Sequence, residues 1–210
     1  MTALPRLADH SATIGYDRHA LRPGVVHLGL GAFHRAHQAP LFDQLAATGD
    51  RRWGIVGVAM RSPDVITALA AHDGLYSLSI RGDRNDPPTV IGALCDLRIA
   101  AREPDEVIAA MAAPSAQLVT LTVTEKGYLD HGPASPAGLV AHALDTRHRQ
   151  GRAPLTLLSC DNRTGNGAMM RDAVLAAGQA AGLADATLHW IEQQCAFPSS
   201  MVDRITPATT

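Results

Sequence analysis

Short apolar runs alternate along the chain with longer stretches in which apolar residues recur at helical spacing. The apolar runs are typical of β-strands, and they cover residues 25–30, 53–60, 118–124 and 155–159. The amphipathic stretches predict helices over residues 36–48, 63–71, 103–113, 139–150, 166–181 and 185–195. Because strands and helices alternate, we expect an α/β fold with a doubly wound, mostly parallel sheet.

A different β pattern interrupts this alternation between residues 75 and 94. Residues 75–80 and 89–94 are short β runs, and the segment between them, Arg-Gly-Asp-Arg-Asn-Asp-Pro-Pro, is rich in turn-forming residues. Two short β runs joined by such a segment predict a β-hairpin. The hairpin is expected as an insertion in the parallel α/β unit.

Composition and charge limit the possible partners of the chain. Its 210 residues are 46% hydrophobic and 18% charged, with a net charge of −2, which suits a globular domain and provides no basic stripe for nucleic acid. No apolar stretch reaches the length of a membrane span, and residues 1–24 lack the apolar core of a signal peptide. We therefore expect a cytoplasmic protein without nucleic-acid or membrane partners, with an N-terminal extension over residues 1–24 and one domain over residues 25–210.

The spacing of cysteine and histidine does not favour a disulfide framework or a metal site. Cys95, Cys160 and Cys195 form an odd set without Cys-x-x-Cys spacing, so we expect reduced thiols. His34 and His37 are three residues apart and would share one face of a helix, but no third ligand follows at a suitable spacing. We expect capping and packing roles for these histidines and no bound metal.

The most informative motif lies at residues 25–38, Val-Val-His-Leu-Gly-Leu-Gly-Ala-Phe-His-Arg-Ala-His-Gln, which predicts a strand, a glycine turn and the start of a helix. Gly29 and Gly31 stand where the first βα turn of a dinucleotide-binding unit needs glycine, one for the tight turn and one for the approach of a pyrophosphate. His34 stands in the place of the usual third glycine. The pattern alone leaves two interpretations open, a cofactor site and a glycine turn that only packs.

Three further segments follow in order, Val-Thr-Leu-Thr-Val-Thr-Glu-Lys-Gly-Tyr at 119–128, Leu-Ser-Cys-Asp-Asn at 158–162 and Phe-Pro-Ser-Ser-Met-Val-Asp-Arg-Ile-Thr-Pro at 197–207. Together with residues 31–38 they resemble the long-chain polyol and hexuronate dehydrogenases, the family of mannitol 2-dehydrogenase and fructuronate reductase. The resemblance implies a Rossmann-type NAD-binding domain and hydride transfer between NAD(H) and a 2-keto sugar or hexuronate and its polyol or aldonate. It covers only the N-terminal half of the family, so the C-terminal helical domain with the catalytic lysine is expected to be missing here.

The turn residues are candidates for holding the pyrophosphate, and the resemblance adds residues beside the nicotinamide ring. Asp64 follows the second strand, where a carboxylate can bind the adenosine ribose and repel a 2′-phosphate, which favours NAD. Arg61 argues for NADP, and Ser62 or Asp64 could instead be a helix N-cap. The candidate cofactor-binding residues are Gly29, Leu30, Gly31, Ala32, Phe33, His34, Arg35, Asp64, Thr122, Thr124 and Glu125.

Asn162 is the candidate catalytic residue, because its carboxamide can donate a hydrogen bond to a developing alkoxide. The alternative interpretation is a turn formed by Asp161 and Asn162. Lys126, the only lysine, is not the residue that matches the family's catalytic lysine. By resemblance the residues near the nicotinamide and substrate are Val202, Asp203 and Arg204, of which the last two could instead form a structural ion pair.

Two functions therefore remain open from the sequence. The first is an NAD-dependent oxidoreductase acting on a small-molecule sugar or polyol, either fructose and mannitol or fructuronate and mannonate. The second is a truncated or split-enzyme module that binds NAD and has no catalysis of its own. The loop over residues 131–136 is shorter than is usual in the family, so the sequence does not predict how the entrance of the active site is closed.

Overall fold

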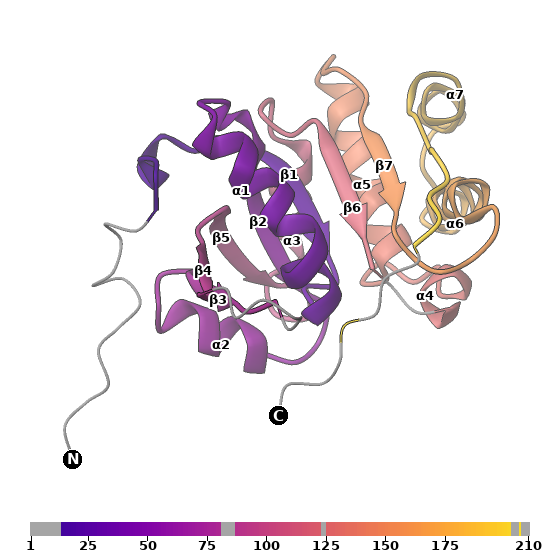
Figure 1. Cartoon of the computed structure of the whole chain (residues 1–210). Coiled ribbons are helices and arrows are strands. Elements are labelled where there is room, and N and C mark those ends of the chain that lie inside the picture. The colour runs from indigo at the N-terminus through magenta and orange to yellow at the C-terminus, as the bar shows by residue number, and fades with distance from the viewer. Residues whose placement is uncertain (1–13, 81–86, 123–124, 203–205, 207–210) are drawn as a thin grey trace.

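A five-stranded parallel sheet forms the centre of the computed structural model, which describes residues 14–80, 87–122, 125–202 and 206 (Figure 1). The strand order is β5-β2-β1-β6-β7, so the chain runs outward from β1 in one direction and then returns to build the other side. This confirms the expected doubly wound α/β fold. The strands are β1 (Pro23–Leu28), β2 (Gly54–Ala59), β5 (Leu94–Ile99), β6 (Leu118–Leu121) and β7 (Thr156–Ser159).

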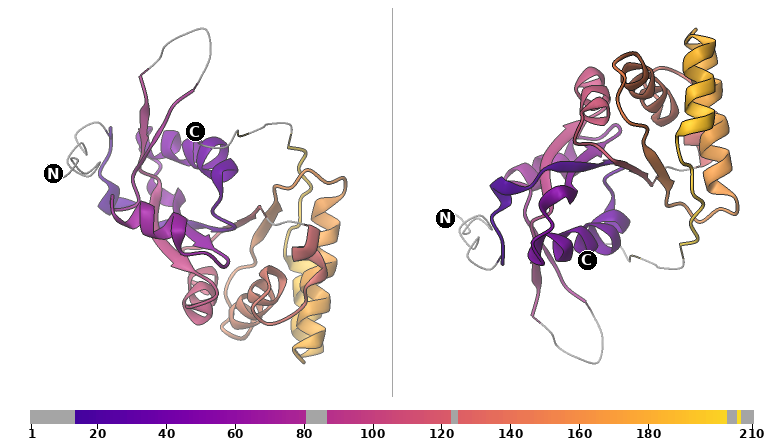
Figure 2. Two further views of the ribbon diagram at one scale, coloured as in Figure 1. Left: turned by 90° about the horizontal axis from the view of Figure 1, so that it is seen from below. Right: turned by 90° about the horizontal axis from the view of Figure 1, so that it is seen from above.

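Helices cover both faces of the sheet. Successive side chains along a strand point to opposite faces, so they belong to two separate hydrophobic cores. Val25 belongs to the core under the first two helices, whereas Val26 belongs to the core under the later ones. In Figures 1 and 2 the N-terminal helices lie at one end of the molecule and the C-terminal ones at the other. The helices are α1 (Ala39–Ala47), α2 (Asp64–Ala70), α3 (Pro104–Ala112), α4 (Glu125–Leu129), α5 (Pro136–Arg149), α6 (Asn166–Ala180) and α7 (Asp185–Gln194). Among the described residues, no helix is both long and apolar enough to cross a membrane.

The predicted hairpin is confirmed as a separate two-stranded sheet. Strands β3 (Tyr76–Leu78) and β4 (Thr89–Ile91) pair antiparallel, and residues 81–86 of their connection lie outside the described residues. The described part of the N-terminal extension packs beside it, since Arg18 donates from Nε to the carbonyl of Gly92 at 2.9 Å. The extension is therefore attached to the domain at residues 14–22.

Two elements differ from the sequence expectation. Strand β5 was not predicted, because it is an edge strand whose buried ends flank half-buried polar residues, including the ion pair of Arg98 with Asp96 at 2.8 Å. Helix α5 begins at Pro136, three residues before the predicted start at 139, because Ser135 Oγ accepts a hydrogen bond from the Gly138 amide at 3.0 Å. A serine N-cap followed by proline is a favourable helix start, so the loop before α5 is shorter than expected.

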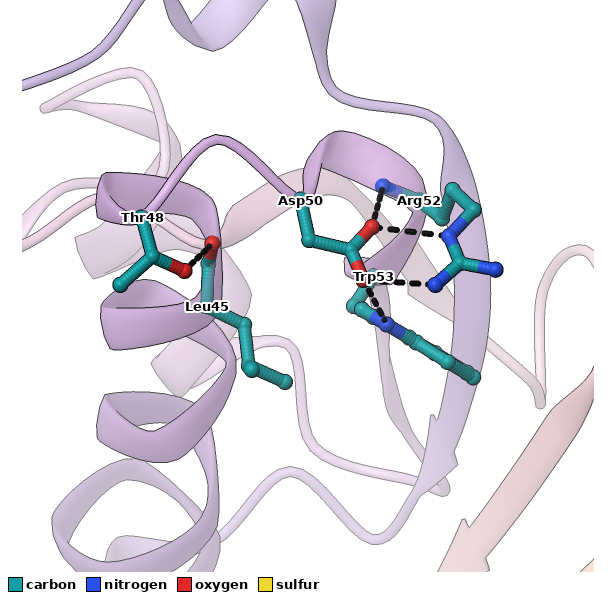
Figure 3. Close-up of polar contacts among 5 residues, drawn as sticks. All are labelled: Leu45, Thr48, Asp50, Arg52 and Trp53. Carbon is teal, nitrogen blue, oxygen red and sulfur yellow. Dashed lines mark hydrogen bonds and ion pairs between the residues drawn. The ribbon is translucent and has the colours of Figure 1, made fainter.

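The connection from α1 to β2 is fixed by one carboxylate (Figure 3). Asp50 accepts hydrogen bonds from the Arg52 guanidinium at 2.8 Å and from Trp53 Nε1 at 3.0 Å. The hydrogen bonds from Arg52 hold the pKa of Asp50 well below its usual range. This corner aligns the start of β2 beside β1, where Gly24 approaches Arg52 so closely that an added Cβ would lie 2.0 Å from its carbonyl oxygen.

A buried guanidinium joins α5 to the end of α3. The side chain of Arg147 is 2% exposed and donates to the carbonyls of Met111 at 3.0 Å, Ala113 at 2.8 Å and Ala153 at 2.8 Å. Arg152 also donates to this end of α3, through the Ala112 carbonyl. The negative end of the helix dipole thus receives two cations, one of them buried.

Replacing Arg147 by methionine should lower the free energy of unfolding by about 3 kcal/mol, because the buried carbonyls that it serves lose their donors. Urea unfolding followed by circular dichroism measures the change. Arg149→Met is the matched control, since Arg149 lies two residues further along α5, has a side chain that is 69% exposed and pairs with Asp145 at 2.9 Å. Its loss should be about 0.5 kcal/mol or less. Equal losses in the two variants would contradict the role given to Arg147.

Candidate cofactor and active site

The glycine turn lies where the strand order reverses, at the carboxyl ends of β1 and β6. Gly29 has a φ of +100°, and a Cβ added there would lie 2.5 Å from the carbonyl oxygen of Thr122. Both the backbone conformation and the contact therefore require glycine. Open α/β sheets bind ligands in the crevice at such a reversal, so the turn is in the expected place for a cofactor.

Gly31 has a different reason to be glycine. A Cβ added to it would meet only the carbonyl oxygen of Gly29, at 3.5 Å, which is an ordinary contact. The helix begins at Ala32, and the first intrahelical bond runs from the Arg35 amide to the Gly31 carbonyl at 3.3 Å. The amides before Arg35 have no partner within the helix. Open space at Gly31 and these amides fit a bound pyrophosphate.

His34 is buried in the position of the usual third glycine, and its ring stacks on His27 of β1. The ring centroids are 3.5 Å apart and the planes differ by 15°. The third glycine normally allows close packing of helix on strand, and an imidazole cannot fit in that space. The helix accordingly widens into a π-helical turn over His34–Gln38 before α1. The predicted helix over residues 36–48 thus starts earlier and has an irregular first turn.

Hydrogen bonds define the state of the His27 ring. The Thr122 hydroxyl donates to the Gly29 carbonyl at 2.7 Å, so it can only accept from His27 Nε2, which lies 3.1 Å away. His27 Nε2 therefore carries the proton, and Nδ1 accepts from the Thr120 hydroxyl at 2.8 Å. Burial, and then the neighbouring His34, lower the pKa of His27 well below its usual value, so the ring is neutral.

The second ring connects the turn to β7. His34 Nδ1 lies 2.7 Å from Gln38 Oε1, and Gln38 Nε2 donates to Cys160 Sγ at 2.7 Å. Burial lowers the pKa of His34 to about 4 and raises the pKa of the Cys160 thiol to about 11. A chain of neutral polar groups therefore runs beneath the turn from β6 through β1 to β7.

The end of β7 is held from two sides. The Tyr128 hydroxyl contacts Ser159 Oγ and Asp161 Oδ2. On the other side, the fully buried Asn166 donates to the carbonyls of Asp161 at 2.8 Å and Ser200 at 2.9 Å. Asn162 directly follows this fixed segment and is exposed. Asn162 thus lies at the carboxyl end of a parallel strand, the end at which open α/β sheets bind ligands.

The remaining predicted site residues are distributed unevenly. Asp64 is exposed at the first position of α2, where its amide donates to Ser62 Oγ at 3.2 Å, and this favours the predicted cap role of Ser62. Arg35 is half-buried, and its NH1 lies 3.5 Å from the Leu30 carbonyl. Glu125 is the first residue of α4, and Val202 is half-buried. The predicted residues that lie outside the described part of the chain are Thr124, Asp203 and Arg204.

Sequence reasoning missed several residues that support the turn. His27 gave a signal, because a histidine inside an otherwise apolar strand needs a polar partner when it is buried. Thr120 and Tyr128 gave none, since their partners are distant in sequence. Gln38 lies four residues after its partner His34, which is a helical spacing, but its second partner Cys160 is distant. Across the described residues, no group of three or more His, Cys, Asp or Glu side chains is close enough to hold a metal ion. His34 and His37 accordingly have no third ligand within that part of the chain, and the three cysteines are free thiols there.

Known proteins match nearly the whole chain. The model of the mannitol dehydrogenase Rossmann domain matches residues 23–210. The chain is 39% identical to mannitol 2-dehydrogenase of Cereibacter sphaeroides, over 92% of this chain and 45% of that relative. It resembles a solved Pseudomonas fluorescens mannitol 2-dehydrogenase in ternary complex with NAD and D-mannitol, with a TM-score of 0.85, 36% identity and coverage of 94% of this chain and 45% of that one. A D-sorbitol dehydrogenase in substrate-free form gives a TM-score of 0.82 at 32% identity. The chain thus spans less than half the length of these relatives.

The buried imidazoles predict an acid-sensitive fold. Because the pKa of His34 is about 4 in the folded state and near 6.5 when exposed, its stabilising effect is complete above pH 6.5 and is lost as the pH falls toward 4. His34→Gln should reduce the slope of unfolding free energy against pH by about 1.4 kcal/mol per pH unit in that window. Urea unfolding between pH 7.5 and 4.5 measures the slope, with the exposed His189 changed to Gln as control. An unchanged slope in His34→Gln would contradict the neutral state of this ring.

Proposed function

Since this chain belongs to the mannitol dehydrogenase Rossmann-domain family, we propose that it is the NAD(H)-binding part of a polyol or hexuronate dehydrogenase. The reaction is reversible hydride transfer between NAD(H) and a 2-keto sugar or hexuronate and its polyol or aldonate. Fructose with mannitol and fructuronate with mannonate are the two substrate pairs considered. The mannitol 2-dehydrogenases among the similar proteins favour the first pair.

The observation that carries the proposal is the pair of glycines at the reversal of the strand order. Gly29 is required by the fold, whereas Gly31 is not required by any contact within the described residues. A glycine that the fold does not need, beside the amides of a helix start, is explained by a ligand that approaches the backbone closely. A pyrophosphate is the ligand that fits this combination of space and donors.

The proposed roles of the other residues follow from their positions. The backbone from Gly31 to His34 binds the pyrophosphate and the guanidinium of Arg35 adds positive charge, whereas the Leu30 amide already donates to the Val58 carbonyl at 2.9 Å. Asp64 accepts hydrogen bonds from the adenosine ribose. The residues proposed to border the nicotinamide and the substrate are Thr122, Thr124, Glu125, Val202, Asp203 and Arg204.

When NAD(H) is bound, it would supply or accept the hydride. In the direction of reduction, negative charge develops on the substrate oxygen as the carbonyl carbon becomes tetrahedral. The Asn162 carboxamide donates a hydrogen bond to that oxygen and stabilises the charge. The proton that completes the alcohol comes from a general acid. We propose that this acid lies in a second domain, equivalent to the half of the relatives that this chain does not cover.

The second candidate is a module that binds NAD(H) and catalyses nothing by itself. The chain covers 45% of the similar enzymes, so their whole activity is not carried over to it. The two candidates share cofactor binding and differ in whether the chain supports turnover once it is joined to the second half that the relatives carry. Adding the candidate substrates and NADH to the chain extended by that half, and following absorbance at the nicotinamide band, distinguishes them.

Gly31→Ala tests the cofactor site, because it changes the space for a ligand with little effect on the fold. The variant should keep its free energy of unfolding to about 0.5 kcal/mol and lose about tenfold or more in NADH affinity. Fluorescence titration with NADH measures the affinity. Gly15→Ala is the matched control, because an added Cβ there meets nothing within 4 Å and the residue lies in the N-terminal segment. Wild-type affinity in Gly31→Ala would contradict the pyrophosphate assignment.

Asn162→Ala tests the proposed contact with the substrate oxygen. In a protein extended by the second half that the relatives carry, turnover should fall about a hundredfold, as expected for the loss of one donor to a developing oxyanion. NADH affinity should remain within about twofold, because Asn162 is exposed beyond β7 and is not part of the glycine turn. A collapse of NADH affinity with turnover per bound cofactor unchanged would assign Asn162 to the cofactor instead.

A further inference from the structure

A cavity of about 750 Å³ opens at the carboxyl ends of β2, β5 and β6. It is beside the glycine turn, because Thr122 lines it and also contacts Gly29. The other walls come from the residues that follow β2 and β5 and from the segment that leads into α5. The lining residues include Met60, Arg61, Ala101, Thr122 and Asp130.

Among the described residues, two charged side chains line this cavity, and they differ in their surroundings. Asp130 accepts a hydrogen bond from the Gly132 amide at 3.0 Å, so its carboxylate is already used in a local turn. Arg61 is exposed, and within the described ranges it forms no ion pair. The guanidinium therefore provides an available positive charge at the cavity.

The position of Arg61 in the chain indicates which ligand group this positive charge could bind. In dinucleotide-binding folds, the residues after the second parallel strand meet the adenosine ribose. A carboxylate there binds the 2′-hydroxyl, and an arginine accommodates a 2′-phosphate. Here β2 ends at Ala59, and Arg61 follows two residues later, whereas Asp64 is in α2 and does not line the cavity.

We propose that Arg61 is a specificity-determining residue that binds the 2′-phosphate of NADP(H), so that this chain accepts NADP(H) as well as NAD(H). The proposal rests on the proposed function, since it concerns the same cofactor site. A guanidinium presents a fork of N–H donors that matches the oxygens of a phosphate. Asp64 acts in the opposite direction, because its negative charge disfavours the phosphate, and the two residues together set the ratio of the two affinities.

Parallel titrations of the 210-residue chain with NADH and NADPH, followed by nicotinamide fluorescence, test the proposal. The wild type should bind NADPH within about tenfold of NADH. Arg61→Ala should weaken NADPH binding about tenfold to a hundredfold, as expected for lost hydrogen bonds to a charged group, and change NADH binding less than about threefold. Asp64→Ala should shift the ratio toward NADPH. Raising the salt concentration should reduce the NADPH affinity more than the NADH affinity.

Arg102→Ala is the matched control, because Arg102 is an exposed arginine that follows the neighbouring strand β5 and does not line the cavity. It should leave the ratio of affinities unchanged. NADH binding without NADPH binding, or an equal loss of both in Arg61→Ala, would overturn the inference and leave the proposed function intact. Absence of binding to either nucleotide by a chain that is folded by circular dichroism would instead refute the proposed function.

Discussion

The candidate site depends on one constraint, which is that the carbonyl of Thr122 lies too close to the backbone of Gly29 for any side chain there. It brings the ends of β1 and β6 together at the point where the strand order reverses. With no side chain between them, the chain can turn at Gly29 and begin a helix three residues later. The hydroxyl of Thr122 then closes the contact by donating to the Gly29 carbonyl. A larger residue at this point would move the helix start, and with it every amide that faces the crevice.

The stacked imidazoles show how a departure from a familiar pattern is accommodated. Where a glycine would let the helix lie directly on the strand, His34 keeps the two apart by the thickness of a ring. The π-helical turn absorbs the extra space, and His27 supplies a flat partner. The turn is also connected, through Gln38, to Cys160, which directly follows β7. The glycine turn and the segment before Asn162 are therefore parts of one packed unit.

The sequence predicts the features that depend on local pattern. Alternating strands and helices, the hairpin and the two glycines could all be read from spacing and residue type, because each is determined by neighbours in the chain. Strand β5 could not, since its polar centre is tolerated only at the edge of the sheet. The clamp of Tyr128 on Asp161 joins residues 33 positions apart, and no local signal encodes it. The location of Arg61 on a cavity likewise depends on a wall built from distant segments.

The two faces of the sheet stabilise their buried polar side chains in different ways. On the α5 face, the cation of Arg147 is offset by peptide carbonyls at the end of α3, and carbonyl dipoles do not take up protons. On the α1 face, the buried groups are imidazoles, which must remain uncharged. Acidification toward pH 4 consequently disturbs the packing beneath the glycine turn, because the His34 ring then takes up a proton. The carbonyls that hold Arg147 have no proton-accepting group in this range.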